Sequence, residues 1–173
     1  NKYYSNILKE MNSTLSKRGP DEEGYYLNNN VCMAHKRLIV IDPDGGKQPM
    51  IENYSFGDYV IVYNGQIYNT KELKDVLISN GFTFNGHCDT EILLKSYIHY
   101  GTDVVNHLNG IFAFAIWDCK NNSVFLARDH LGVKPLFYTI LDDTLIFASE
   151  LKAIFKFPNI ENIIDSQGVS ELF

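Results

Sequence analysis

Apolar residues near the start of the chain recur at intervals of three and four, with polar residues between them. This spacing places them on one face of a helix, and Gly19-Pro20 follows as a stop signal of the kind that ends helices. We therefore predict an amphipathic helix over residues 3–17. Its apolar positions are Tyr4, Ile7, Leu8, Met11 and Leu15.

The pattern then changes to short, densely apolar stretches that are typical of strands. Residues 24–27 (GYYL) and 31–41 (VCMAHKRLIVI) flank the turn-forming run NNN at 28–30, so we predict a hairpin. Residues 42–50 have the composition of a loop. Residues 59–63 (YVIVY) are expected to form a buried strand.

Helical spacing returns in the middle of the chain. Residues 70–81 (TKELKDVLISNG) predict a helix with Thr70 as its N-cap and Gly81 beyond its end. A second helix is expected to open at Asp89 or Thr90. Asn64-Gly65 falls between the strand and the first of these helices, where we place it in a polar connection.

The second half of the chain is almost wholly β-like, which predicts an antiparallel meander of short strands. Phe112, Phe114 and Ile116 alternate with other apolar residues, so their strand should be covered on both faces. A short helix (150–157) and a tail (165–173) close the chain. The four strands are expected at residues 111–118, 123–129, 136–140 and 144–149.

Strands in two groups, with helices between and after them, indicate an α+β fold. We expect a sandwich of two antiparallel sheets packed face to face, with helices on both outer sides. A single domain should cover residues 1–173, because no internal repeat or low-complexity segment divides the chain.

Composition narrows the function classes. A net charge of −6 and a pI of about 5.3 argue against nucleic-acid binding, and favour small polar substrates or protein partners. Cys32, Cys88 and Cys119 have no CxxC or zinc-like spacing, so we expect no disulfide framework, no metal site and a reducing cytoplasm. The apolar runs are too short for a membrane span, and no signal-peptide pattern precedes them.

Three sites carry candidate chemistry. Arg37 stands in an apolar strand, where it either grips a carboxylate with two parallel hydrogen bonds or forms a structural ion pair. Asn64-Gly65 is either a plain loop or a side-chain amide beside a glycine N–H, the pair of donors that holds an oxyanion. Asp89 is either a helix N-cap or an acceptor for a substrate ammonium, and the two roles are compatible.

Together these groups suit a free α-amino acid whose side chain is attacked, although a nucleophile is missing. Arg128 and Asp129 follow a strand and are expected to form a local ion pair, with Gly132 and Pro135 as turn residues. The five histidines show no metal-binding spacing.

Eight segments of the chain, in unbroken order, resemble the N-terminal glutaminase domain of glutamine-hydrolysing asparagine synthetases, a class II glutamine amidotransferase. They are RGPD (18–21), HKRLIVID (35–42), GGKQPM (45–50), YNGQIYN (63–69), DTE (89–91), LNGIFAFAIWD (108–118), RDHLGVKPLFY (128–138) and ASELKAI (148–154). The resemblance implies the four-layer αββα sandwich of N-terminal-nucleophile hydrolases. It also implies hydrolysis of L-glutamine to glutamate and ammonia, as part of asparagine biosynthesis.

The resemblance assigns roles to individual residues. Arg37 would bind the α-carboxylate of glutamine, helped by the backbone of Leu38, Ile39, Val40 and Ile41. Asn64 and Gly65 would hold the tetrahedral oxyanion, and Asp89 would accept from the α-ammonium. Gln66 stands where the family often has Glu, so it keeps a polar role without the charge.

One departure from the family pattern is severe. Family members begin with a cysteine in a first strand, whose thiolate attacks the amide while its own α-amine serves as base. This sequence shows no such residue, so we expect the 173-residue chain to lack glutaminase activity by itself. Either the first strand is omitted, or the domain is a non-catalytic scaffold like that of β-lactam synthetases. Another class II amidotransferase is a third alternative.

The resemblance also implies partners. A C-terminal synthetase domain, absent from this sequence, would use ATP and Mg²⁺ to activate aspartate and would receive the ammonia. Residues 128–138 and 148–154 would help to face that domain. No cofactor is expected in the glutaminase domain itself, and an exposed sheet edge would leave a homodimer as an option.

Overall fold

The structure, a computed structural model, describes residues 2–39 and 45–163. The expected tail lies outside the described residues. The helices are α1 (Lys2–Ser13), α2 (Thr70–Ser79), α3 (Asp89–Tyr100) and α4 (Leu151–Ile154), with a 3₁₀ helix, η1, at Gly101–His107. The strands are β1 (Glu22–Leu27), β2 (Cys32–Arg37), β3 (Met50–Tyr54), β4 (Gly57–Ile67), β5 (Gly110–Asp118), β6 (Ser123–Arg128), β7 (Phe137–Leu141) and β8 (Thr144–Ala148).

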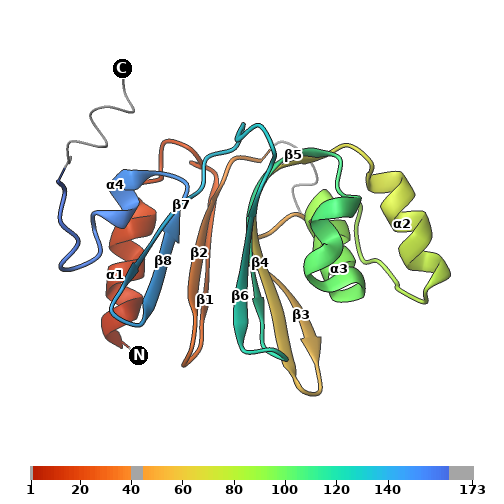
Figure 1. The fold of residues 1–173 in the computed structure, drawn as a ribbon, viewed down its shortest axis with the longest axis horizontal. Coiled ribbons are helices and arrows are strands. Elements are labelled where there is room, and N and C mark those ends of the chain that lie inside the picture. The colour runs from red at the N-terminus through yellow and green to blue at the C-terminus, as the bar shows by residue number, and fades with distance from the viewer. Residues whose placement is uncertain (1, 40–44, 164–173) are drawn as a thin grey trace.

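The elements stack in four layers (Figure 1). An antiparallel sheet in the order β3-β4-β5-β6 is covered on one side by α2 and α3, and the hairpins β1-β2 and β7-β8 lie on its other side, next to α1 and α4. The α+β sandwich is therefore confirmed. The meander is wrong in one respect, because β6 and β7 belong to different layers. Within the described residues the two hairpins share no ladder hydrogen bonds, so the second β layer is split.

Strand β5 forms the centre of the core and is buried on both faces, as its continuous apolar run predicted. Phe112, Phe114 and Ile116 pack with the residues of α3, whereas Ala115 and Trp117 pack towards the hairpins. Each such buried side chain contributes about 1.5–3 kcal/mol relative to an exposed one. The strand therefore joins the two apolar cores on either side of the sheet.

Helix α1 ends at Ser13, earlier than the apolar spacing predicted. The hydroxyls of Ser13 and Thr14 donate to the carbonyl oxygens of Glu10 and Met11, both at 2.7 Å. Short hydroxyl side chains compete with the helical backbone in this way, and turns follow up to Arg18. Leu15 still packs beside the small core of α1 and α4.

The turn between β1 and β2 forms as predicted. The Asn28 side chain accepts from the backbone N–H of Asn30 at 2.8 Å and of Val31 at 2.7 Å, and so closes the loop. Strand β2 ends at Arg37, four residues before the predicted end at 41.

Strand β4 is much longer than the YVIVY run indicated. It continues through Asn64 and Gly65 to Ile67, so these two residues lie in a strand and not in a polar connection. The cause is strand β5, which extends far enough to pair with them and places Ala113 opposite Asn64 and Phe112 opposite Gly65. Ladder pairing overrides the turn propensity of an Asn-Gly pair.

The two helix caps also differ from the prediction. Asn69, and not Thr70, precedes α2. Its side chain connects the end of β4 to the segment that leads into β5. It donates to the His107 carbonyl at 2.9 Å and accepts from the Asn109 N–H at 2.9 Å. Asp89 is the first residue of α3, its cap position is Cys88, and its carboxylate makes no capping bond.

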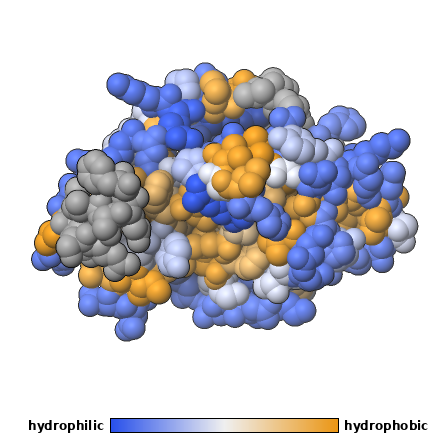
Figure 2. Space-filling model, turned by 45° about the horizontal axis from the view of Figure 1, so that its top comes forward, coloured by the Kyte–Doolittle hydropathy of each residue, from blue (hydrophilic) through white to orange (hydrophobic). Residues whose placement is uncertain are grey.

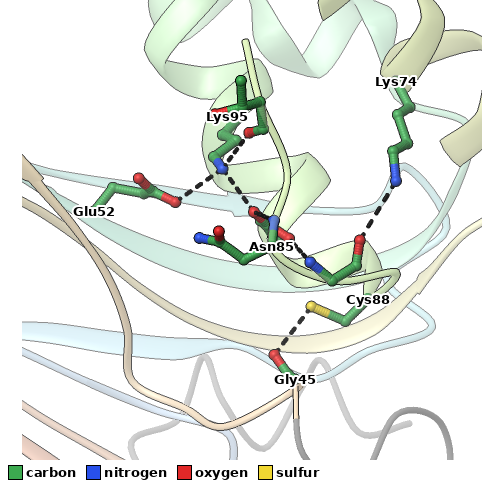
Figure 3. A network of polar contacts seen from close by, with 9 residues as sticks. Gly45, Glu52, Lys74, Asn85, Cys88 and Lys95 are labelled. Atoms are coloured by element: carbon green, nitrogen blue, oxygen red, sulfur yellow. Dashed lines mark hydrogen bonds and ion pairs between the residues drawn. The ribbon is translucent and has the colours of Figure 1, made fainter. Parts of the chain in front are cut away.

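A buried ion-pair network fixes the segment between α2 and α3 (Figure 3). The Lys95 ammonium lies 2.6 Å from Glu91 and 3.1 Å from Glu52 on β3. Glu91 in turn accepts from the backbone N–H of Asn85 at 2.8 Å and of Gly86 at 2.9 Å. Burial opposes ionisation of Glu91, but these hydrogen bonds outweigh it and lower the pKa. The network therefore anchors the segment at Asn85 and Gly86 to the first turn of α3.

Replacing Lys95 by Met should lower the free energy of unfolding by about 3 kcal/mol, because two carboxylates would remain without their cation and Glu91 is buried. Urea unfolding at neutral pH measures this. Lys152→Met removes the same charge from an ion pair with Glu150 whose lysine is half-exposed, and should cost less than about 1 kcal/mol. Equal losses in the two variants would contradict the structural role of the buried network.

Candidate functional site

A cavity of about 1010 Å³ lies between the split hairpin layer and the central sheet. Side chains of α1, β2, β4, β5 and β8 line it. Figure 2 brings the top of Figure 1 forward and shows apolar surface near the middle of that face, bordered by hydrophilic residues. The cavity thus combines apolar walls with polar groups, as ligand sites commonly do.

The structure brings most of the predicted site residues to this one cavity. Ile39 is not among its lining residues, and Val40 and Ile41 lie outside the described residues. The predicted residues that line the cavity are Arg37, Leu38, Asn64, Gly65, Gln66 and Asp89.

Arg37 ends β2 and lies directly opposite Glu22 of β1. Its Nη1 donates to Glu22 at 2.7 Å, and the arginine side chain is only 7% exposed. Arg37 therefore forms the structural ion pair that was one of its two predicted roles. A guanidinium carries five N–H groups in a planar fork, so this ion pair is compatible with binding a substrate carboxylate.

The end of β4 runs on past its partner β3, and side chains take the place of the missing strand. Gln48 pairs with both backbone groups of Tyr63: its Oε1 accepts from the N–H at 2.6 Å, and its Nε2 donates to the carbonyl at 3.1 Å. Two positions beyond Gly65, the N–H of Ile67 donates to Asp89 at 3.3 Å.

Gly65 lies between these two anchored residues. Alternate residues of a strand direct their N–H groups to opposite sides, so the N–H of Gly65 faces the same open edge as those of Tyr63 and Ile67. The Asn64 side chain projects from the strand on the face opposite to that of Tyr63. Within the described residues, the Asn64 amide makes no side-chain hydrogen bond. Two donors thus border the cavity side by side.

Only glycine fits at position 65. A Cβ atom there would lie 2.3 Å from the Ile111 carbonyl oxygen and 2.8 Å from Cε2 of Tyr63. Both contacts are far shorter than van der Waals distance, and one of them is with backbone, so the strand would have to move. The close packing of neighbouring atoms explains why position 65 is a glycine, although the residue lies in a strand and not in a turn.

Asp89 holds its carboxylate at the cavity end of α3. Its Oδ2 accepts from the Tyr63 hydroxyl at 2.7 Å and from the Ile67 N–H at 3.3 Å. The helix N-terminus provides a favourable field for a carboxylate. Asp89 therefore faces the β4 edge and does not cap its own helix.

His35, Gln48 and Tyr63 are site residues that the sequence analysis did not select. His35 Nε2 lies 3.1 Å from the Tyr63 carbonyl oxygen, which requires this nitrogen to carry the proton. Burial lowers the pKa of His35 from 6.5 to about 4, so the ring is neutral at pH 7. These three residues could have been found from the sequence, because they lie in the segments HKRLIVID, GGKQPM and YNGQIYN, respectively.

A family model described as glutamine amidotransferase domain matches residues 1–173. The chain belongs to the glutamine amidotransferase domain family. This confirms the class of protein that the eight segments indicated.

Curated relatives of this amidotransferase domain include longer enzymes. Over 96% of its length the chain is 49% identical to the glutamine-hydrolysing asparagine synthetase 3 of Bacillus subtilis, and over 86% it is 42% identical to synthetase 1 of that organism. The chain spans 27% and 23% of these two relatives, or about a quarter of their length.

A solved structure shares the fold of the amidotransferase domain. Glutamine phosphoribosylpyrophosphate amidotransferase from B. subtilis aligns with 87% of the chain and 40% of its own, at a TM-score of 0.71 and 21% identity. The likeness supports the sandwich architecture.

The connection between β6 and β7 leads from one β layer of the amidotransferase domain to the other. The predicted ion pair between Arg128 and Asp129 is absent from the described residues, because both side chains bind backbone instead. Asp129 accepts from the N–H groups of Val133 at 2.9 Å and Lys134 at 3.0 Å, while Arg128 donates to the Lys134 carbonyl at 2.7 Å. Leu131 projects from this braced turn and is 89% exposed.

Within the described residues, none of the three cysteines of the domain forms a disulfide. Burial raises the pKa of both Cys32 and Cys119, and Cys88 donates to the Gly45 carbonyl at 3.3 Å. Within residues 2–39 and 45–163, no helix is long and apolar enough to cross a membrane.

The depressed pKa of His35 predicts an acid-sensitive fold. The unfolded chain binds a proton at His35 near pH 6.5, whereas the folded chain does so only near pH 4, so stability falls as pH falls through this window. Between pH 7 and pH 5 we expect the free energy of unfolding to drop by about 2 kcal/mol.

Urea unfolding at several pH values tests this dependence. His35→Gln keeps an N–H donor for the Tyr63 carbonyl but cannot titrate, and should flatten the profile between pH 7 and pH 5. A profile of unchanged slope in that variant would show that other groups cause the acid sensitivity.

Proposed function

We propose that the chain binds L-glutamine in the cavity and forms the glutaminase half of an asparagine synthetase. The observation that carries this proposal is that a guanidinium, an amide-glycine pair and a carboxylate, far apart in the sequence, line one cavity. These groups match the α-carboxylate, the reacting carbonyl and the α-ammonium of a free amino acid.

Each group has a defined part in binding and reaction. Arg37 binds the α-carboxylate, together with the chain from Leu38 to Ile41. The Ile39 N–H donates to Asp21 at 2.8 Å, which anchors the chain at Ile39 next to Arg37. Asp89 accepts from the α-ammonium, and Gln66 adds a neutral polar contact.

The reaction is an acyl transfer. A thiolate adds to the side-chain carbonyl of glutamine, and the C–S bond forms as the carbonyl electrons move to oxygen. Asn64 Nδ2 and Gly65 N–H stabilise that oxyanion in place. Collapse of the adduct breaks the C–N bond and expels ammonia with a proton from the general base, and water then hydrolyses the thioester to glutamate.

The nucleophile is not supplied by the described cysteines, whose thiols are buried, raised in pKa or hydrogen-bonded. We place it in a preceding strand that begins with cysteine and lies in the cavity between the two hairpins. The support for this strand is that the two hairpins line the cavity but share no ladder hydrogen bonds within the described residues.

The acceptor of ammonia is a synthetase domain like that of the longer relatives, which would use ATP and Mg²⁺ to activate aspartate. Supply of ATP makes the cytoplasm the expected compartment. The exposed Leu131, Val133 and Tyr138 lie on or beside the braced turn, and give an apolar surface for that domain.

Isothermal titration calorimetry with L-glutamine tests the binding site. The chain should bind L-glutamine, and Arg37→Ala should weaken binding by at least roughly 30-fold, because the substrate carboxylate would lose its charged partner. Lys71→Ala makes the same change of charge on the exposed side of α2 and should leave the affinity unchanged. Equal affinities of the Arg37→Ala variant and the original chain would reject the assigned clamp.

Release of glutamate and ammonia tests the nucleophile. The 173-residue chain should bind L-glutamine without hydrolysing it, whereas a chain extended by a first strand with an N-terminal cysteine should hydrolyse it. Cysteine-to-alanine substitution at that first position should abolish turnover and preserve binding. Hydrolysis by the unextended chain would locate the nucleophile elsewhere.

A further inference from the structure

Tyr63 connects the two ends of the candidate site. Its hydroxyl donates to Asp89 at 2.7 Å, and its ring lies against Gly65, where a Cβ atom would come within 2.8 Å of Cε2. The side chain is almost fully buried in the core beneath the sheet. One aromatic side chain therefore contacts both the carboxylate and the glycine.

We propose that Tyr63 is a positioning residue that makes the site selective for a substrate with an α-ammonium group. It does so by holding the Asp89 carboxylate at the β4 edge, beside Gly65. The inference rests on the proposed function and adds a specificity determinant to it.

The hydrogen bonds around Asp89 explain the selectivity. Its Oδ2 accepts from both the Tyr63 hydroxyl and the Ile67 N–H, which holds this oxygen at the β4 edge. Within the described residues Oδ1 accepts no hydrogen bond, and Asp89 lines the cavity. One oxygen thus serves the protein, and the other remains for an ammonium donor.

Side chains from two other segments hold the backbone of Tyr63. Gln48 binds its N–H and its carbonyl, and His35 binds the same carbonyl. On the ring side, Tyr63 packs so close to Gly65 that a Cβ atom there would lie 2.8 Å from Cε2. An oriented carboxylate at a fixed distance from the oxyanion donors follows from this anchoring.

A purely structural hydroxyl is the alternative, and the chain contains a matched example. Tyr97 of α3 donates to the buried Asp118 at 3.1 Å, in the same way as Tyr63 donates to Asp89. Neither Tyr97 nor Asp118 lines the cavity. Tyr97→Phe therefore removes a buried tyrosine-aspartate hydrogen bond without touching the site.

The experiment compares two ligands by isothermal titration calorimetry. L-glutamine carries the α-ammonium, and glutaramate is the same molecule with hydrogen in its place. In Tyr63→Phe we expect roughly tenfold weaker binding of L-glutamine, because the carboxylate loses a hydrogen bond that orients it. Binding of glutaramate should not change. Tyr97→Phe should preserve the ratio of the two affinities.

Equal weakening for both ligands, or no weakening for either, would overturn the role of Tyr63. The Asp89→Asn variant distinguishes failure of the Tyr63 inference from failure of the proposed ammonium site. If Asp89→Asn removes the preference for L-glutamine but Tyr63→Phe retains it, only the Tyr63 inference fails. If the original chain shows no preference for L-glutamine over glutaramate, the assigned ammonium site fails as well.

Thermal unfolding will establish whether Tyr63→Phe is folded at the temperature of the titration. If it is not, replacement of Tyr63 by 3-fluorotyrosine keeps the ring and alters the strength of the hydroxyl as a donor. A changed affinity ratio with unchanged glutaramate binding supports the inference, and an unchanged ratio contradicts it.

Discussion

The geometry of the site depends on one mismatch of strand lengths. Strand β4 is paired with β5 to its end, but β3 leaves it after Ile61. Backbone groups along the remaining edge still need partners, since unpaired buried amides are costly. Gln48 and Asp89 satisfy this requirement on either side of Gly65, and in doing so bring a loop and a helix terminus to the same place.

This arrangement explains how an ordinary antiparallel sheet can present a backbone donor to the cavity. A fully paired strand would have no backbone donor to offer, and a free loop would not hold one in place. The terminal part of β4 combines a rigid ladder on one side with side-chain partners on the other. Preorganised donors of this kind stabilise developing charge without having to reorient.

The sequence was sufficient for the α+β sandwich and the buried β5 strand, and six of the predicted site residues line the cavity. It was insufficient where tertiary contacts decide. Asn64-Gly65 has the local preference of a turn, and only the reach of β5 makes it strand. Asp89 stands in the sequence where an N-cap is expected, but it is the first residue of α3 and its carboxylate accepts from the Tyr63 hydroxyl on the sheet. Pairs separated by 26 positions leave no local signal.

The turn after β6 is hydrogen-bonded directly to the central strand β5. Asp129 is bound twice to Phe112, through its own N–H to the carbonyl at 2.8 Å and through its Oδ2 from the N–H at 3.2 Å. Phe112 is the residue opposite Gly65. The turn that carries the exposed Leu131 is therefore hydrogen-bonded, through Asp129, to the residue that lies opposite the glycine.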